Sequence, residues 1–405
     1  MPTNRPQRHA RATTTDLKAD VAATRDRLVE LRRHFHMHPE LAMAEHATAG
    51  RIAEELRRAG LDVREGVGGT GVVGLLRGDH PGRVLLVRAD IDALPIEERT
   101  GAEYASRTPG LMHACGHDGH IAIGLVMAEI LAARRAELHG TVKFAFQPAE
   151  EQVAGASAMI AAGVLRDPAP DAVIGLHLSS KLPVGQVGVQ DGPCLASVDS
   201  ITLRVRGRGG HGAVPQLNID PILAAAEIVV AAQTLVSREI SPFNPAVVTF
   251  GMIHGGTAGN IIADEVQLGG TLRAYSADDR AHLVRRLGEL AAHVATALRA
   301  TAELEISGGT PACINDAAMA ELMRRAVVAT VGADHLTSRN PLGSASDDMA
   351  LFLEAVPGCY CFVGAGNVAR GIDATHHSNH FDIDEDALPI GVELMARATL
   401  EYLGG

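Results

Sequence analysis

Residues 83–90, RVLLVRAD, are a run of mostly apolar side chains that ends on an aspartate. Short apolar runs bounded by glycine are typical of strands buried on both faces of a sheet. Segments with helical spacing lie between this run and others like it. Such alternation predicts an α/β fold, in which a mostly parallel sheet carries helices on both faces.

The same pattern extends through the first half of the chain. Sites in open α/β sheets gather at the C-terminal ends of strands, and Asp90, Glu150 and His177 lie at or just after such ends. The predicted helices are Asp16–Phe35, His46–Ala59 and Ile121–Arg135, and the predicted strands are Val72–Leu76, Arg83–Ala89, Thr141–Phe146 and Ala172–Leu178.

The pattern changes around Leu195 to a β-α-β-β-α-β order, which predicts a small inserted α+β domain. A chain of 405 residues is too long for one ordinary core. We therefore expect residues 16–194 and 310–405 to form one domain, interrupted by residues 195–309, and residues 1–15 to be a disordered tail. The expected elements after Leu195 are strand Ser200–Val205, helix Pro221–Ser237, strands Ala246–Gly251 and Glu265–Ala274, helix Asp278–Ala300, and strands Glu303–Ser307 and Gly358–Val363.

The composition argues against several classes of partner. A net charge of −12 repels phosphate backbones and anionic lipid, so we expect neither nucleic acid nor membrane as a partner. The start of the chain does not resemble a signal peptide, and no stretch looks apolar for long enough to span a bilayer. Five scattered cysteines are not a disulfide framework and fit a reducing compartment. These features predict a cytoplasmic protein.

The densest group of ligand-type residues is MHACGHDGH at 112–120. Thiolate and imidazole, here Cys115 and His117, bind zinc, manganese, cobalt and nickel to differing degrees. A polar helix start around a buried thiol would explain a lone Cys-x-His pair. Five ligand-type residues within nine positions favour a metal site instead.

A second group, FQPAEE at 146–151, ends a predicted strand. A buried carboxylate needs a cation or a proton, and one of two neighbours can bind metal while the other accepts a proton from water. An exposed acidic turn is the competing explanation. His177 and the segment THHSNH at 375–380 could complete the shell, although a lone buried histidine is more often structural.

Together these motifs resemble the aminoacylase/carboxypeptidase family of two-metal peptidases, in particular the branch of hippurate hydrolases and plant indole-acetyl-amino-acid hydrolases. The resemblance runs from about Leu28 to the C-terminus, and its eight motifs keep the family's order. They are FHMHPELAMAEHAT, RADIDALPI, MHACGHDGH, FQPAEE, GRGGHGAVPQLNIDPI, GGTAGNIIAD, GTLRAY and HHSNHFDIDED.

The resemblance implies a catalytic domain interrupted by a lid or dimerisation domain, and two divalent ions per subunit. Manganese or zinc is expected, with cobalt or nickel as alternatives. Cys115 is expected to bridge the ions, with His117 and His177 on one ion and Glu151 and His377 on the other. The neighbouring His376 is the alternative to His377.

The resemblance also implies roles in catalysis. Glu150 is expected to be the general base, acting on water whose pKa the ions lower. Asp92 matches an aspartate that orients a metal ligand from behind, and Asp90 is expected beside it. The neighbouring histidines His113, His120 and His380 are expected in supporting or surface positions. His34, His36 and His38 are not expected in the site, because two-residue spacing on a helix does not put all three on one face and relatives carry this segment as a structural element.

Three residues of the inserted domain match functional positions in relatives. His211 matches a histidine that reaches the partner subunit's active site and steadies the developing oxyanion. We therefore expect a homodimer through the lid domain. Asn260 and Arg273 match positions that hold the substrate's α-carboxylate. The competing explanations are a solvated turn for His211 and a surface ion pair for Arg273.

The expected activity is hydrolysis of the amide bond of a small N-acyl amino acid to a carboxylic acid and an amino acid. Alternatives are a deacetylase of the N-acetyl-diaminopimelate type and a dipeptidase or carboxypeptidase of the same superfamily. From another class, the chain could be an inactive metal-binding or lid-mediated assembly protein. The intact Glu150 argues against this alternative. Departures from the family's usual residues at Gln216, Ala263, Asp347 and Asn379 bear on substrate preference.

Overall fold

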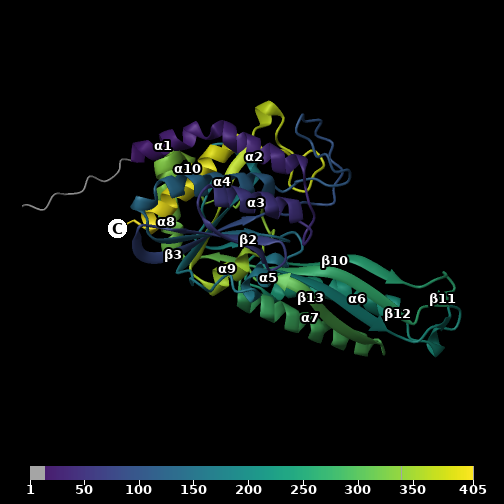
Figure 1. Ribbon diagram of the computed structural model, residues 1–405. Coiled ribbons are helices and arrows are strands. Elements are labelled where there is room, and N and C mark those ends of the chain that lie inside the picture. The colour runs from purple at the N-terminus through teal and green to yellow at the C-terminus, as the bar shows by residue number, and fades with distance from the viewer. Residues whose placement is uncertain (1–13, 339, 405) are drawn as a thin grey trace, which may run out of the picture.

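The larger of two main sheets has eight strands in the order β1-β2-β4-β3-β5-β16-β6-β15. The computed structural model describes residues 14–338 and 340–404 (Figure 1). The strands are β1 Asp62–Val67, β2 Gly71–Arg77, β3 His80–Asp90, β4 His139–Gln147, β5 Ala172–Pro183, β6 Val187–Gly188, β15 Leu336–Thr337 and β16 Gly358–Gly366.

The central strands of this sheet are parallel. β3 pairs in parallel with β4 and β5, and β5 pairs in parallel with β16. β1 and β2 add an antiparallel edge. Because the parallel strands end at one edge, Asp90 lies opposite Gln147 there, and His177 lies opposite Phe362. The predicted α/β fold with a mostly parallel sheet is confirmed.

Helices cover both faces of the larger sheet, because alternate apolar side chains of β3 enter different cores. Leu85 and Val87 belong to one core and Leu86 to the other. The first core is closed by α1 Thr14–Ala23, α2 Arg25–Met37, α3 His46–Arg58, α4 His117–Ala133, α8 Ala317–Val331 and α10 Ala387–Tyr402, and the second by α5 Gly155–Ala161 and α9 Met349–Ala355.

A smaller α+β part projects from the larger one (Figure 1). Its four-stranded antiparallel sheet has the order β10-β12-β8-β13, with β10 at an edge. Short strands β9 (Gly210–His211) and β11 (Ile261–Ile262) pair at its far end. In chain order its main elements are β8 Val198–Arg206, α6 Pro221–Thr234, β10 Ala246–Gly255, β12 Glu265–Ala274, α7 Ala277–Ala297 and β13 Thr301–Thr310.

The chain enters and leaves the smaller part through two strands that pair with each other. β7 (Gly192–Leu195) leads out, and β14 (Cys313–Asn315) leads back. Leu195, where the sequence pattern changes, lies opposite Cys313 in this pair. The two crossings therefore lie side by side.

Some element boundaries differ from those predicted. The single helix predicted at 16–35 is two helices, and Thr24 between them donates its hydroxyl to Val21 O at 2.8 Å. α1 begins at Thr14, inside the predicted tail, whose residues 1–13 lie outside the described part of the chain. β1 was not predicted because three of the six residues in its sequence, DVREGV, are charged and interrupt any apolar run.

One helical run, Pro221–Glu239, is long and apolar enough to cross a membrane by length and composition alone. The expectation that no stretch reaches this length is wrong for this run. It consists of α6 and a π-helical turn, Leu235–Glu239. Ala225 and Ile228 are buried against the smaller sheet, as in a helix of a folded domain. A single run of this kind is weak evidence for a membrane span.

Candidate active site

Five segments of the larger part bring polar side chains to the C-terminal edge of its parallel strands. Two segments follow β3 and β4, one is the end of β5, one is the start of α4, and one is the loop before α10. They contribute Asp90 and Asp92, Glu150 and Glu151, His177, Cys115 and His117, and His376 and His377, respectively.

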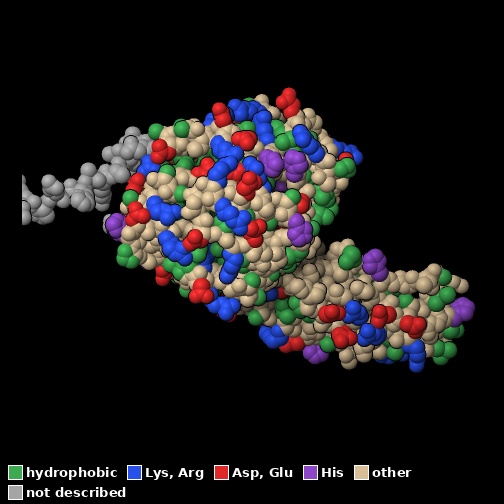
Figure 2. Space-filling view, in the orientation of Figure 1, with side chains coloured by type: hydrophobic (Ala, Val, Ile, Leu, Met, Phe, Trp, Pro, Cys, Tyr) green, Lys and Arg blue, Asp and Glu red, His purple; other side chains and the backbone are tan. Residues whose placement is uncertain are grey.

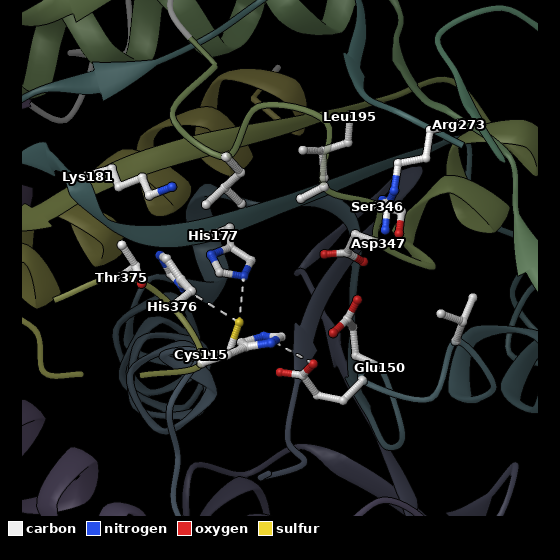
Figure 3. A pocket seen from close by; sticks show the side chains of 15 residues that line it. Cys115, Glu150, His177, Lys181, Leu195, Arg273, Ser346, Asp347, Thr375 and His376 are labelled. Carbon is white, nitrogen blue, oxygen red and sulfur yellow. Dashed lines mark hydrogen bonds and ion pairs between the residues drawn. The ribbon is translucent and has the colours of Figure 1, made fainter. Parts of the chain in front are cut away.

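The thiol of Cys115 is buried at the centre of this cluster. Its Sγ lies 3.6 Å from His177 Nε2 and 3.6 Å from His376 Nδ1 (Figure 3). Ligand atoms of Cys115, His177 and His376 lie within 4.8 Å of one another, and so do those of Cys115, Glu151 and His377. One sulfur therefore belongs to two groups of candidate ligands, as a bridging ligand must.

His117 presents one ring nitrogen to the cluster and uses the other to fix its orientation. Nδ1 lies 2.9 Å from the backbone oxygen of Asp92, a distance at which it donates a hydrogen bond. Nε2 is buried beside Glu150 and Glu151 and has no hydrogen-bond partner among the described residues. A histidine that binds metal through one nitrogen usually donates the other N–H to a carbonyl or carboxylate.

Asp92 also holds the acidic pair. One carboxylate oxygen accepts the backbone N–H of Glu150 and the other that of Glu151, each at 3.1 Å. Ala149, just before them, has φ +51°, a region that non-glycine residues seldom occupy. Such backbone strain is found where surrounding contacts fix a functional loop.

The electrostatics of the cluster favour a bound cation. Burial raises the pKa of the Cys115 thiol well above its ordinary value, and the carboxylates of Glu151 and Glu150 raise it further. Burial and the nearby Asp347 raise the pKa of Glu150 well above its usual range. Burial alone would lower the pKa of His117, but Asp90 and Asp92 raise it to about 10. Buried like charges of this kind are costly unless a cation neutralises them.

Unpaired buried atoms show that these residues fit metal ions. His117 Nε2, Glu151 Oε1 and His376 Nε2 are buried without hydrogen-bond partners in the described part of the chain. Sulfur, imidazole nitrogen and carboxylate oxygen together suit zinc and other first-row divalent ions. The donor set therefore fits the pair of divalent ions that the family resemblance implies.

Both histidines of the C-terminal loop reach the cluster. His377 Nε2 lies 3.3 Å from Glu151 Oε2, and its backbone has φ +64°. His376 is closer to Cys115, and burial together with His377 lowers its pKa to about 3. The geometry leaves both as candidate ligands.

The three predicted residues of the smaller part lie in two places. Arg273, in β12, lines the cavity above the cluster and donates from Nη1 to Ser344 O at 2.8 Å. His211 is exposed in β9, and Asn260 is exposed beside β11, at the far end of the projecting part (Figure 1). Neither lines this chain's own cavity.

A buried charge network beneath the cluster was not predicted. Arg88 donates to Asp90 at 2.6 Å, to Asp347 at 2.9 Å and to Asp348 at 3.1 Å. Tyr360 donates its hydroxyl to Asp347 at 2.6 Å. The available signal was an arginine within the otherwise apolar run RVLLVRAD, since a buried guanidinium needs several acceptors.

A second buried network ties the N-terminal helices to the site. Arg32 donates from Nε to Asp118 at 2.8 Å and from Nη2 to Asp382 at 2.6 Å. His36 Nδ1 lies 2.7 Å from the same Asp118 carboxylate. Because Asp118 follows His117 and Asp382 lies in the C-terminal loop, Arg32 links two segments that carry candidate ligands.

A cavity of about 490 Å³ opens above the cluster. It lies between the edge of the larger sheet and the start of the smaller part (Figure 3). Its lining is Cys115, Glu150, Glu151, Val153, His177, Lys181, Leu195, Arg273, Leu342, Ala345, Ser346, Asp347, Thr375, His376 and His377.

The fold and this cluster define a two-part α/β hydrolase with a candidate two-metal centre. The model of peptidase family M20/M25/M40 matches residues 86–401. The chain belongs to this family of metal-dependent hydrolases, and the resemblance drawn from its motifs is confirmed.

Three relatives and one solved structure show how far the similarity extends. IAA-amino acid hydrolase ILR1-like 4 of Arabidopsis thaliana is 38% identical over 93% of this chain and 86% of its own. N-acetylcysteine deacetylase of Bacillus subtilis is 38% identical over 93% of this chain and 97% of its own. Thermostable carboxypeptidase 2 of Saccharolobus solfataricus is 36% identical over 95% of this chain and 98% of its own. The Bacillus subtilis YXEP protein, described as a dinuclear metal binding peptidase, has a TM-score of 0.82 at 33% identity, covering 94% of this chain and 99% of that one.

Proposed function

We propose that this enzyme hydrolyses the amide bond of small N-acyl amino acids, giving a carboxylic acid and an amino acid. The observation that carries the proposal is the placement of Arg273 in the same cavity as Glu150 and the Cys115 cluster. No ion pair joins the Arg273 guanidinium to a carboxylate among the described residues. An arginine fork matches the geometry of a substrate carboxylate. Two relatives are named for hydrolysis of this class.

Cys115, His117, Glu151, His177 and His377 would hold two divalent ions. Such ions would polarise the substrate carbonyl and lower the pKa of the attacking water. We propose manganese or zinc, with cobalt or nickel as alternatives, because thiolate and imidazole bind these ions to differing degrees and the Glu151 carboxylate suits manganese.

Glu150 is proposed as the general base, which takes a proton from the attacking water and returns one to the departing amine. It is buried next to Glu151 and lines the cavity. Asp92 orients both glutamates through their backbone N–H groups and His117 through its own carbonyl.

A homodimer through the smaller part would bring His211 and Asn260 of one subunit to the cavity of the other. Two features support it. β10 pairs with β12 on one side only, and its other side has no partner strand in the described part of the chain. Large apolar side chains are also exposed on α6, on β10 and at the far end of the smaller part. Exposed apolar patches often mark protein–protein interfaces. The exposed side chains are Leu217, Ile222, Leu223, Val230, Val247, Met252, Ile253 and Ile261.

The surface charge gives no support to a nucleic-acid partner. Figure 2 shows acidic and basic side chains next to one another on the projecting part. Ion pairs there join Arg204 to Glu305 and Arg206 to Glu265. A cytoplasmic location is proposed because the Cys115 thiol must stay reduced to bind metal.

Carboxypeptidase activity is the second candidate, and the relative named thermostable carboxypeptidase favours it. The test is amine release from N-acetyl, N-benzoyl and indole-acetyl amino acids, N-acetyl-diaminopimelate and dipeptides, after chelation and after return of each metal. Cleavage of the N-acyl compounds supports the proposal. Faster cleavage of dipeptides would replace it with the second candidate. No release from any compound by protein loaded with two ions would contradict both.

A further inference from the structure

We propose that Lys181 binds a second anionic group on the acyl side of the substrate. The preferred substrates would then be N-acyl amino acids whose acyl chain ends in a carboxylate, such as N-succinyl amino acids. This inference rests on the proposed function, because it assigns a further contact in the same cavity.

Lys181 reaches the cavity from the strand that carries His177. Both belong to β5, and residues four apart in a strand lie on the same side of the sheet. Figure 3 shows Lys181 and Arg273 at opposite sides of the cavity, with Cys115, His177 and Glu150 between them. The cavity therefore has a cation on each side of the candidate metal cluster.

The Lys181 ammonium group has no partner in the part of the chain that the structure describes. It is exposed, and no hydrogen bond or ion pair involves its ammonium group within the described residues. Lysine is rare here, since the chain has only Lys18, Lys143 and Lys181. Lys143 has a structural role, because its ammonium donates to three backbone carbonyls at 2.7–2.9 Å. Lys181 instead offers three unused donors to the cavity.

The position of Arg273 indicates which end of the substrate Lys181 meets. If Arg273 binds the α-carboxylate, the amino-acid half lies towards β12 and the smaller part. The acyl half then extends past the Cys115 cluster towards His376 and Lys181. Hydrolysis of such a substrate consumes one water and releases a dicarboxylic acid and an amino acid. A flexible ammonium group in a part-enclosed cavity suits a carboxylate at the end of a short chain.

The test compares two substrates that differ only in one charge, N-succinyl-L-alanine and its terminal amide, N-succinamoyl-L-alanine. The kcat/KM ratio of the two is measured for the metal-loaded wild type, Lys181→Ala, Lys181→Glu and the control Lys18→Ala, whose residue is exposed on α1. Using a ratio within each variant cancels differences in metal content or folded fraction.

We expect the wild type and Lys18→Ala to prefer the succinyl compound by about tenfold, as a charge-assisted hydrogen bond would give. Lys181→Ala should remove the preference and Lys181→Glu should reverse it. A wild-type ratio near one, or a preference for the succinyl compound that persists in Lys181→Ala, overturns the inference. Cleavage of N-succinamoyl-L-alanine in the same assay would still support the proposed function. If neither compound nor any other N-acyl amino acid is cleaved, the proposed function fails and the inference falls with it.

Discussion

The carboxylate of Asp92 accepts the backbone N–H of Glu150 at 3.1 Å, so the residue behind the cluster fixes the position of the proposed base. Its second oxygen accepts the N–H of Glu151, and its carbonyl accepts the Nδ1–H of His117. One residue therefore positions the proposed base and two proposed ligands.

Asp92→Asn is expected to lower kcat/KM by about 10- to 100-fold, the usual cost of losing such a supporting contact. The amide NH₂ would face a backbone N–H donor where a carboxylate oxygen now accepts. Steady-state kinetics and metal content should be measured together, with the exposed Asp79→Asn as the control. Wild-type kinetics in Asp92→Asn would show that these hydrogen bonds are dispensable.

Replacing each C-terminal histidine separately distinguishes the two candidate ligands. His377→Ala should lose about one of the two ions, because His377 Nε2 lies 3.3 Å from Oε2 of Glu151, a proposed ligand of the same ion. His376→Ala should retain both ions and should lose less activity than His377→Ala. The measurement is the number of ions bound per subunit, determined by metal analysis after dialysis against a buffer of controlled free metal concentration. The reverse pattern would assign the ligand to His376, which lies nearer Cys115.

Arg32→Met should lower the free energy of unfolding by about 3–5 kcal/mol, because it leaves the buried Asp118 carboxylate without its guanidinium. The neighbouring Arg33→Ala is the control. Arg33 is part-exposed, pairs with Glu385 and lies over the Tyr104 ring, and its removal should cost about 1 kcal/mol because exposed contacts of this kind are weak. Denaturant unfolding of metal-free protein measures both. Equal, small effects would show that the Arg32 network contributes little.

The stability of the smaller part should fall at acid pH because of one carboxylate, that of Glu239. Hydrogen bonds from Arg286, helped by His282, lower the pKa of Glu239 to about 2. A carboxylate with a lowered folded-state pKa adds stability above its unfolded pKa, near 4.5, and this stability is lost as the pH falls from there towards 2.

Glu239→Gln should therefore be less stable than the wild type at pH 7 by about 1 kcal/mol at most, given the partial exposure of the pair. The difference should shrink between pH 4.5 and 3. Thermal unfolding of chelated protein across this range measures it, with the exposed Glu227→Gln as the control. A difference independent of pH would contradict the assignment.

The sequence predicts most of this architecture because the relevant signals are local. Apolar runs such as RVLLVRAD mark strands, and CGHDGH and PAEE each place candidate ligands within a few residues of one another. These motifs were sufficient to identify the family and the fold.

The supporting networks were not predictable because their partners are distant in the chain. Arg88 and Asp347 are separated by 259 residues, and Arg32 and Asp382 by 350. No periodicity links such pairs, and only packing of the helices and strands brings them together. The same reason explains why the sequence could not show that Lys181 and Arg273 share one cavity.

The most direct test of the proposed mechanism is amine release by the wild type and Glu150→Gln, each analysed for metal. The wild type should lose activity on chelation and regain it when manganese or zinc returns. Glu150→Gln should keep both ions, because Glu151 is the proposed ligand, and turn over at least about 100-fold more slowly. Near-normal turnover by the variant would contradict the role of Glu150 as base, and loss of an ion would show that Glu150 and Glu151 have exchanged roles.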